Sequence, residues 1–401
     1  MFRLGRSRFT SLAIIALLVA LLAVMTVGVS SCGTKSDPSF SKDVQEKLDK
    51  VLADTMSEYG VPGAIVGIWV PGKGSYVVAR GKADLKTGRA ANSTDKFRLA
   101  CITKTFTSTV ILQLVDEGKI KLDDTLSKFD LGVNVPGADK ITVRQLLNHT
   151  SGLFNFTDDP NFWIAVMSNP LKPWTSKELV EIAISHPPNF QPGQDYKYNN
   201  TDFELLKMII MKVTGNSAED EITKRIIDPL GLKNTSYPKA DDPKVPNPHL
   251  NGYMPPDWGA QRGTTNLNDL VDVTEYDPFA EGMISNLSDL KIWAKDFAEG
   301  KLLSPNMQKE RLKDLVPPNN PQAGLGFLYA AGFIGRSGEL PGYNPAMYYE
   351  PKSGITIVAA VNRYPSKDEG VVDIIWINLM KTLKEANVLP SNILASPETG
   401  K

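Results

Sequence analysis

Two pairs of strand-like segments lie near opposite ends of the chain, and this arrangement constrains the fold more than any other feature. In the first pair, 63-GAIVGIWV-70 and 75-SYVVARG-81 lie on either side of PGKG. In the second pair, 346-AMYYE-350 and 355-ITIVAAVN-362 lie on either side of PKSG. Strand-forming residues around short turns predict antiparallel pairing. Strands at both ends of the chain imply one sheet that is assembled from distant segments.

The residues between the two pairs have mainly helical periodicity. From about residue 100 to 290, helical patterns alternate with loops, and six prolines lie between Pro238 and Pro256. Loops this rich in proline are not helical, so they separate the helices. Amphipathic spacing also predicts helices over 41–60 and from about Val371 to Ala386. We therefore predict an α/β fold in which helices flank an antiparallel sheet and an all-helical lobe is inserted.

This division predicts the domain boundaries. A cleft between a sheet lobe and a helical lobe is a natural place for a catalytic site. The expected parts are a signal segment over 1–32, a spacer over 33–40, and one domain over 41–390, with a sheet lobe at about 41–97 and 298–390 and a helical lobe at about 98–297.

The N-terminus has the pattern of a bacterial export signal. Arg3, Arg6 and Arg8 precede an apolar run from Leu12 to Val29, and a polar spacer follows. Small residues before Cys32 resemble a lipobox, in which cleavage leaves a lipidated cysteine as the first residue. The alternative is an uncleaved anchor, because about 18 apolar residues can span a bilayer. Both readings place the rest of the chain outside the cytoplasm, attached to a bacterial membrane.

Composition narrows the possible partners. The chain is 42% hydrophobic, which supports a packed globular protein. Its 44 Lys and Arg residues nearly balance 45 Asp and Glu residues, so nucleic acid is not an expected partner. The chain has two cysteines, and assigning Cys32 to a lipid leaves Cys101 without a disulfide partner. A lone thiol in an oxidising compartment requires a reason, either chemistry or burial.

The first candidate site is the start of 97-FRLACITKTFTSTVILQLVDEGK-119. Lys104 follows Cys101 by three positions, which places both on one face of a predicted helix. Apolar residues from Phe106 to Leu114 anchor this helix, and Gly118 is a suitable stop. A helix N-terminus stabilises negative charge on a sulfur or an oxyanion. Cys101 is therefore a candidate nucleophile; the alternative is a buried cysteine that only fills space.

The second candidate site precedes the predicted helix in 196-YKYNNTDFELLKMIIMKVTG-215. Thr201 and Glu204 have the spacing of a capping box, so Tyr198 and Asn200 fall in the loop before the helix. A phenol can relay a proton, and an amide can bind both a nucleophile–lysine pair and a substrate carbonyl. Taken alone, these residues are more typical of a packed tyrosine and a turn asparagine.

The third candidate site is 335-GRSGELPGYNPAMYYEPKSG-354, a strand segment bracketed by glycines. Glycines beside a strand allow a ligand or another backbone to approach closely. Arg336 can hold a carboxylate through two parallel hydrogen bonds. The alternative is a surface arginine paired with Glu339.

Together and in this order, the three segments resemble the motifs of the penicillin-recognising serine hydrolases, which include class C β-lactamases, D-alanyl-D-alanine carboxypeptidases and esterases. That family has S-x-x-K at the start of a central helix, Y-x-N on a loop, and K-T-G or H-T-G on a strand. The counterparts are 101-CITK-104, 198-YNN-200 and 336-RSG-338. The likeness is greatest to the carboxypeptidase branch and extends over about residues 41–365. Four further segments support it: 141-ITVRQLLNHTSGL-153, 190-FQPGQDYKYNNTDFELL-206, 228-DPLGLKNTSYP-238 and 281-EGMISNLSDLKIWAKDF-297.

The resemblance implies catalysis through a covalent acyl-enzyme. Residue 101 would attack a carbonyl, and Lys104 and Tyr198 would move the proton. The N–H groups of Cys101 and Glu339 would form the oxyanion hole. The implied substrates are a peptidoglycan-like peptide, a β-lactam or a small ester. The implied substrate-binding residues are Asn200, Arg336, Ser337, Gly338 and Glu339.

The chain departs from the family at two motifs. Cys101 replaces serine, and because sulfur is larger, its displacement by about 1 Å can cost on the order of 100-fold in rate. A thiolate is, however, a far better nucleophile than a hydroxyl. Arg336 replaces lysine or histidine, and it keeps a positive charge for a substrate carboxylate but cannot relay a proton.

Two hypotheses of different classes follow from these departures. The first is an envelope hydrolase that forms a thioester at Cys101, and the retained lysine, tyrosine and asparagine favour it. The second is a non-catalytic envelope protein that binds peptidoglycan stem peptides or another ligand. The three histidines lie far apart with no H-E-x-x-H, and no feature requires a metal or an organic cofactor.

Overall fold

The computed structural model describes residues 38–238, 242–257, 265–276, 282–313, 315–317, 323–364, 370–390 and 393. The predicted signal segment, with Cys32, lies outside these residues, and so does most of the spacer. Within the described ranges, no helix combines the length and apolar character needed to cross a membrane.

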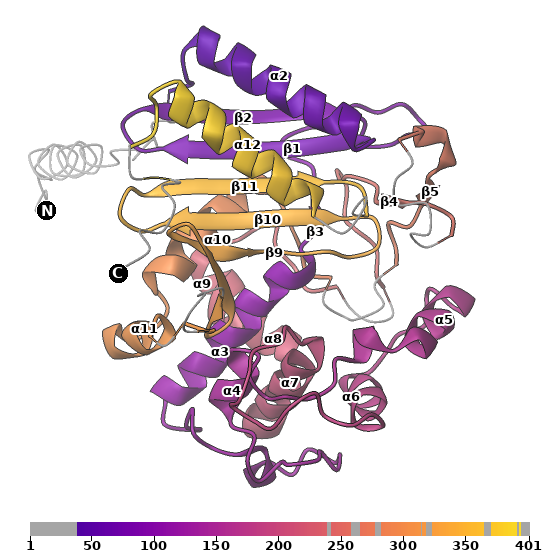
Figure 1. Ribbon diagram of the computed structural model, residues 1–401, viewed down its shortest axis with the longest axis vertical. Coiled ribbons are helices and arrows are strands. Elements are labelled where there is room, and N and C mark those ends of the chain that lie inside the picture. Colours follow the sequence, from indigo (N-terminus) through magenta and orange to yellow (C-terminus); the bar gives the residue numbers. More distant parts are fainter. Residues whose placement is uncertain are drawn as a thin grey trace, which may run out of the picture. The chain divides into compact units, whose positions relative to one another are not determined.

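One seven-stranded antiparallel sheet combines strands from residues 63–81 with strands from residues 323–361 (Figure 1). Its strand order is β2-β1-β11-β10-β9-β8-β7. The pairing of β1 with β11 unites the two predicted hairpins, from Ala64 opposite Val361 to Trp69 opposite Thr356. The predicted antiparallel sheet from distant segments is confirmed. The strands are β1 (Gly63–Val70), β2 (Gly74–Gly81), β7 (Ala323–Gly324), β8 (Phe327–Ala330), β9 (Phe333–Ser337), β10 (Asn344–Glu350) and β11 (Ile355–Val361).

The continuous apolar run of β1 has a direct structural reason. All eight of its residues are buried, because both faces of the sheet are covered. Ala64, Val66 and Ile68 pack into the core on one face, whereas Ile65 and Trp69 pack into the core on the other. Alternation along the strand thus sorts one run of residues into two hydrophobic cores.

Helices α2 (Lys42–Glu58) and α12 (Val371–Glu385) cover one face of the sheet and lie side by side (Figure 1). The side chain of Ser41 caps α2 by accepting a hydrogen bond from the N–H of Val44. The indole of Trp376 in α12 packs against Phe333 and Tyr348, with ring centroids 5.9 and 5.2 Å apart. These contacts connect the last helix to the strands that carry the third motif.

Helix α10 (Leu287–Glu299) lies against the opposite face, in contact with β10 and β11. It therefore belongs to the sheet layer, whereas the boundary predicted from the sequence placed it in the helical lobe. Trp293 explains this position, because it stacks on Phe106 at a centroid distance of 4.5 Å and donates to the hydroxyl of Thr105 at 2.8 Å. Helix α10 thus anchors the start of α3 (Thr103–Asp116) beneath the sheet.

The helical lobe is built around α3 and α7 (Asn200–Thr214), which pack directly on each other. Both helices have fully buried apolar residues in the larger core. The lobe was predicted to be all-helical, but two short antiparallel pairs lie in the same part of the chain: β3 (Phe97–Arg98) with β6 (Ile284–Ser285), and β4 (Tyr253–Met254) with β5 (Val271–Asp272). The other helices are α4 (Val143–Leu147), α5 (Pro160–Ser168), α6 (Ser176–Ile184), α8 (Ala218–Ile222), α9 (Asp228–Leu230) and α11 (Pro305–Arg311).

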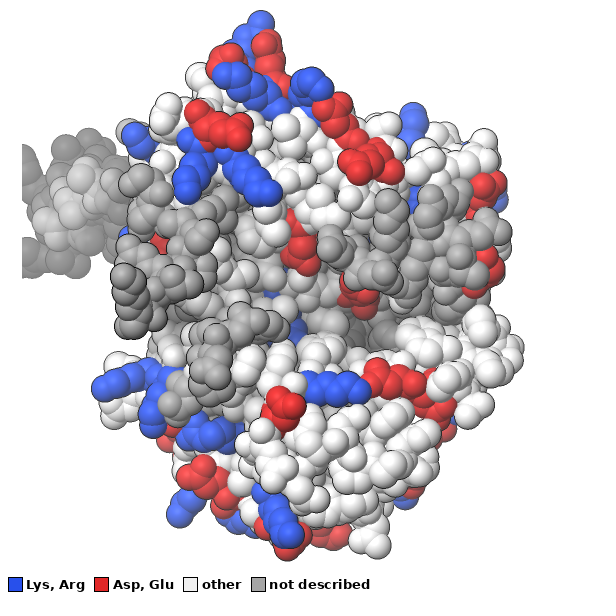
Figure 2. All heavy atoms as spheres, in the orientation of Figure 1, with Lys and Arg blue, Asp and Glu red and all other residues white. Residues whose placement is uncertain are grey.

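Charged side chains of both signs are interspersed on the face drawn in Figure 2. The same view shows a hollow between the part that carries the sheet and the part that carries α5 to α8. The surface over α5 is mainly uncharged in this view, in agreement with its sequence PNFWIAVMS.

Candidate active site

A cavity of about 330 Å³ lies where the start of α3, the loop before α7 and the end of β9 meet. It brings together seven of the residues that the sequence motifs predicted, and Lys104 lies behind its wall. The seven are Cys101, Tyr198, Asn200, Arg336, Ser337, Gly338 and Glu339; the other lining residues are Thr157, Trp163, Leu328, Pro341 and Tyr364.

Cys101 lies in a short 3₁₀ turn, Ala100–Ile102, directly before α3. The predicted helix therefore exists, but its regular α-helical part begins two residues after the cysteine. Ala100 has a φ of 46°, a left-handed conformation that costs about 1–3 kcal/mol for a residue with a side chain. The turn holds a half-buried thiol at the N-terminal end of α3.

Gly338, the residue directly after β9, allows the sheet to approach this turn. A Cβ atom at position 338 would lie 2.4 Å from the backbone nitrogen of Cys101 and 2.9 Å from the Cβ of Ala100. Hydrogen bonds to the next strand fix Gly338, since its N–H donates to Pro345 O at 2.9 Å and its carbonyl accepts from Asn344 Nδ2 at 2.7 Å. Only glycine fits between a fixed strand and the turn.

Tyr198 and Asn200 form a chain of hydrogen bonds that ends at the sulfur. The Tyr198 hydroxyl lies 2.9 Å from Cys101 Sγ and 3.0 Å from Asn200 Oδ1. Asn200 Nδ2 donates in turn to the hydroxyl of Thr157 at 3.1 Å. A phenol has one proton and therefore donates to one of its two neighbours at a time. When it donates to Asn200, its oxygen can accept the thiol proton.

The predicted capping box at Thr201 and Glu204 is wrong. Asn199 caps α7, because its side chain accepts from the N–H of Thr201 at 2.8 Å, and Asn200 is the first residue of the helix rather than a loop residue. The hydroxyl of Thr201 donates instead to Phe154 O at 2.9 Å. Glu204 is fully buried and forms an ion pair with Lys207 at 2.8 Å.

Lys104 lies one turn beyond the cysteine and is 1% exposed. Its Nζ lies 5.5 Å from the ring centroids of both Tyr198 and Phe203. A desolvated ammonium next to an aromatic face is stabilised by the ring quadrupole and raises the local potential. The lysine thus places positive charge behind the phenol that contacts the sulfur.

Arg336 lies in β9 and has no exposed surface. Its guanidinium carbon is 5.2 Å from the Tyr198 ring centroid and 5.8 Å from that of Phe203, and Nη2 lies 3.3 Å from His149 Nε2. Burial lowers the pKa of Arg336, but the neighbouring Tyr198 and Cys101 side chains raise it, and the net shift is upward. The arginine is therefore a second fixed cation beneath the phenol.

The sequence motifs did not predict a role for His149 and Asp202, although His149 lies in the supporting segment LLNHTSGL. Both are completely buried, with His149 Nδ1 3.4 Å from Asp202 Oδ2, and Ser151 donates to Asp202 Oδ1 at 2.5 Å. Burial, followed by the charges of Arg336 and Lys104, holds the pKa of His149 well below its usual value. Burial also holds the pKa of Asp202 well above its usual value. Both shifts favour the uncharged forms of these two side chains.

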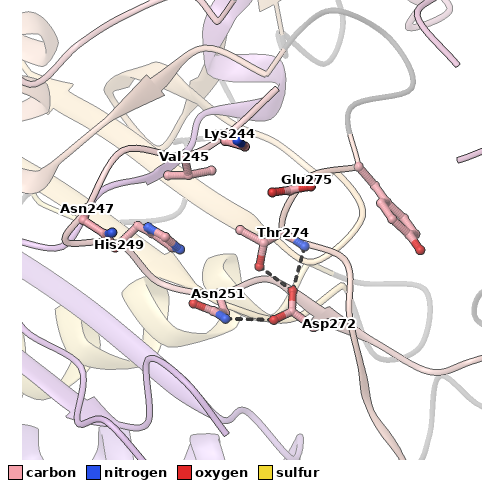
Figure 3. Close-up of a pocket in the computed structure, with 9 residues that line it drawn as sticks. Lys244, Val245, Asn247, His249, Asn251, Asp272, Thr274 and Glu275 are labelled. Carbon is pink, nitrogen blue, oxygen red and sulfur yellow. Dashed lines mark hydrogen bonds between the residues drawn. The ribbon is translucent and has the colours of Figure 1, made fainter. Parts of the chain in front are cut away.

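A second cavity, of about 440 Å³, lies in the part of the chain near β4 and β5 (Figure 3). Asp272 lines this cavity and accepts hydrogen bonds from Asn251 Nδ2 at 2.7 Å and from the hydroxyl of Thr274 at 2.5 Å. The hydroxyl of Thr274 also accepts from Gly252 N–H at 2.9 Å. The described residues that line this cavity include no cysteine or serine. Across the described ranges, no group of three His, Cys, Asp or Glu side chains could hold a metal ion.

Comparisons with known proteins agree with the fold. A D-stereospecific amidohydrolase from Streptomyces sp. is 30% identical, with a TM-score of 0.70 over 83% of this chain and 99% of that chain. The D-amino acid amidase from Ochrobactrum anthropi SV3, solved with L-phenylalanine amide, is 25% identical, with a TM-score of 0.72 over 86% and 100%.

Among curated proteins, Protein flp of Staphylococcus aureus (strain N315) is 26% identical over 334 residues. That match covers 80% of this chain but only 64% of the relative, so this chain spans less than two thirds of that protein's length. Residues 48–379, most of the chain, match the family described as Beta-lactamase. Because this match covers most of the chain, and the two solved relatives described above share its fold, the chain belongs to the Beta-lactamase family.

Proposed function

We propose that this protein is a hydrolase that forms a thioester acyl-enzyme at Cys101, and that it cleaves an amide or peptide bond next to a D-amino acid. The observation that carries the proposal is the 2.9 Å contact between the Tyr198 hydroxyl and Cys101 Sγ inside a cavity bounded by both lobes. The choice of bond is supported by the two amide hydrolases of known structure. The N-terminal sequence supports export and lipid attachment at Cys32, which would place the activity in the cell envelope.

The proposed reaction has two steps. In acylation, the sulfur attacks the carbonyl carbon, its proton passes to Tyr198, and the C–N bond breaks as the phenol protonates the departing amine. In deacylation, water attacks the thioester, yielding a carboxylic acid and restoring the thiol. The N–H groups of Cys101 and Glu339 would stabilise the oxyanion in both steps. Gly338 supports this assignment because it holds the two backbones close together.

The electrostatics favour this reaction over passive packing of the cysteine. Lys104 and Arg336 lie buried near the Tyr198 ring. Positive potential in a poorly solvated site stabilises negative charge on the phenol, the sulfur and the oxyanion. A cysteine that only filled space would not need such surroundings.

The test is intact mass spectrometry of the purified full chain over time with D-phenylalanine amide and with a penicillin, with substrate consumption measured in the same samples. The wild type is expected to form an adduct or to consume a substrate. Cys101→Ala is expected to do neither, and Cys101→Ser should keep part of the activity because the hydroxyl occupies the family's usual position. Equal hydrolysis by the wild type and Cys101→Ala would refute the proposal.

The replacement of serine by Cys101 and of lysine or histidine by Arg336 favours a second candidate, an envelope protein that binds peptides without cleaving them. It predicts that ligands bind equally well to the wild type and to Cys101→Ala, with no adduct and no consumption in either. The same mass measurement, combined with calorimetry of the two proteins, separates the two functions.

A further inference from the structure

We propose that His149 is a positioning residue of this site. It holds the guanidinium of Arg336 beside Tyr198, and Asp202 keeps the imidazole in the tautomer that can accept a hydrogen bond from the arginine. The inference deepens the proposed function and rests on it for the reaction. Its test needs no turnover of a substrate, so the two can fail separately.

The guanidinium of Arg336 has few partners. It is completely buried at the wall of the cavity, and its Nε and Nη1 have no hydrogen-bond partner among the residues that the structure describes. Nη2 lies 3.3 Å from His149 Nε2, and Tyr198 is the other hydrogen-bonding neighbour. The arginine therefore lies between the histidine and the phenol that contacts Cys101 Sγ at 2.9 Å. A group that fixes Arg336 also fixes the positive charge beside this phenol.

The hydrogen bonds around the imidazole favour one tautomer. A guanidinium has no acceptor, so Nε2 contacts Arg336 favourably only when Nε2 is unprotonated. The ring proton is then on Nδ1, which lies 3.4 Å from Asp202 Oδ2. The N–H of Asn199 competes for Nδ1 at 3.3 Å, but a hydrogen bond from a charged guanidinium is roughly twice as strong as one from a neutral amide.

Asp202 can accept the Nδ1 proton bond in either of its protonation states. When the carboxyl group is ionised, both oxygens are acceptors. When it is neutral, its proton can lie on Oδ1, in the 2.5 Å contact with Ser151, and Oδ2 still accepts. The raised pKa of Asp202, which results from burial, is therefore compatible with this role.

The backbone and two neighbouring rings fix His149 itself. Its φ of 60° is a left-handed conformation, and its carbonyl accepts from Lys197 N–H at 3.1 Å. Its ring centroid lies 4.8 Å from that of Tyr198 and 5.3 Å from that of Phe203, the two rings that also pack against Arg336. Burial, followed by the charge of the arginine, holds the pKa of His149 well below its usual value, so Nε2 is free to accept. A strained backbone that presents an acceptor to a buried cation points to function.

The first measurement is NMR of the full wild-type chain labelled with nitrogen-15 histidine, which distinguishes the tautomers. The chain has three histidines, and His149→Phe identifies the signals of position 149 by their loss. We expect the proton on Nδ1 at neutral pH, and a larger population with the proton on Nε2 in Asp202→Ala, because Nδ1–H then loses its acceptor. A wild-type ring protonated on Nε2, or on both nitrogens, would overturn the inference. An unchanged spectrum in Asp202→Ala would refute the role of Asp202.

The second measurement compares the alkylation rates of Cys101 by iodoacetate and by iodoacetamide, followed by mass spectrometry of the peptide that carries this cysteine. The ratio of the two rates reports the positive charge beside the sulfur, because the reagents differ mainly in their charge. We expect the ratio to be about tenfold higher in the folded chain than in the unfolded chain, and Arg336→Gln to remove this preference. His149→Phe should lose most of it, whereas His149→Gln should keep it, because the amide oxygen can replace Nε2 as the acceptor.

His249→Phe is the matched control, because it removes an imidazole from the second cavity and should leave the ratio unchanged. The double variant of His149→Phe with Arg336→Gln should have the same ratio as Arg336→Gln alone, since the histidine acts through the arginine. The inference is overturned if the wild type shows no preference for iodoacetate, or if His149→Phe keeps a preference that Arg336→Gln loses. The wild-type tautomer decides the case in which a variant does not fold. Failure of the wild type to hydrolyse any amide would refute the proposed reaction and leave the positioning role standing.

Discussion

The contact between Gly338 and Cys101 gives the sharpest prediction. In Gly338→Ala, the new Cβ would lie 2.4 Å from Cys101 N, about 1 Å closer than an ordinary contact of about 3.4 Å. The strand is fixed by two hydrogen bonds, so the turn that carries the sulfur must move. A displacement of about 1 Å is expected to slow acylation on the order of 100-fold, with an overpacking cost of about 1–3 kcal/mol.

Gly67→Ala is the matched control. A Cβ at Gly67 would lie 2.3 Å from the Trp69 ring and 2.7 Å from Leu287 Cδ2, a comparable clash on a strand that does not carry the cavity. Thermal unfolding should show similar destabilisation of the two variants, whereas the rate of adduct formation should fall steeply only in Gly338→Ala. Acylation by Gly338→Ala within threefold of the wild type, a difference of about 0.7 kcal/mol in activation free energy, would refute the reasoning.

Two further predictions concern the Tyr198 phenol and the partly buried ion pairs of Arg225. Tyr198→Phe removes the hydroxyl that contacts Cys101 Sγ. We expect the acylation rate to fall by about 10²–10⁴-fold, with little change in unfolding temperature. An unchanged acylation rate would exclude Tyr198 as the proton carrier. Arg225 is hydrogen-bonded to Glu221, which is 2% exposed, and to Glu117, whose pKa it lowers to about 2. Arg225→Gln should therefore destabilise the fold by about 2–3 kcal/mol at neutral pH, after a discount for the partly exposed Glu117. The folded-state pKa values of both carboxyl groups are lowered, so this stabilisation exists above about pH 4.5 and disappears as pH falls toward 2. Urea unfolding should therefore show a smaller difference in stability between wild type and variant in acid than at neutral pH.

The sequence predicted the two hairpins of the sheet well because their strands are short-range patterns on either side of clear turns, but it did not predict the short strands β7 and β8. The residues of β1 alternate between two cores, so each of them had to be apolar, and the run could be recognised without knowledge of its neighbours. The assignment of α10 failed for the opposite reason. Its apolar stripe shows that one face of the helix is buried, but it does not show whether that face packs on the sheet or on other helices. The contacts of Trp293 with Phe106, and of α10 with the sheet, are visible only in the structure.

The site was predictable as a set of motifs but not in its electrostatics. Arginine is rarely buried without a carboxylate partner. Nothing in the sequence around Arg336 therefore predicted that its side chain would be completely buried. His149 and Asp202 are separated by 52 residues in sequence, and their pairing depends on the packing of the loop after α4 against α7. The cap of α7 was misassigned because Asn199 and Thr201 are both suitable capping residues, and the carbonyl of Phe154 decides between them by engaging Thr201.

The closeness of Gly338 to Cys101 has a consequence for how the protein responds to heat. Gly338 is hydrogen-bonded to the sheet, and Cys101 lies in the turn before α3. The reactive arrangement therefore exists only when the sheet and this turn hold one relative position. A slip of about 1 Å between them leaves the hydrophobic cores largely intact but separates the sulfur from its partners. Inactivation on warming should therefore precede the cooperative loss of helical signal, and a ligand that contacts both bodies should raise the inactivation temperature more than the unfolding temperature.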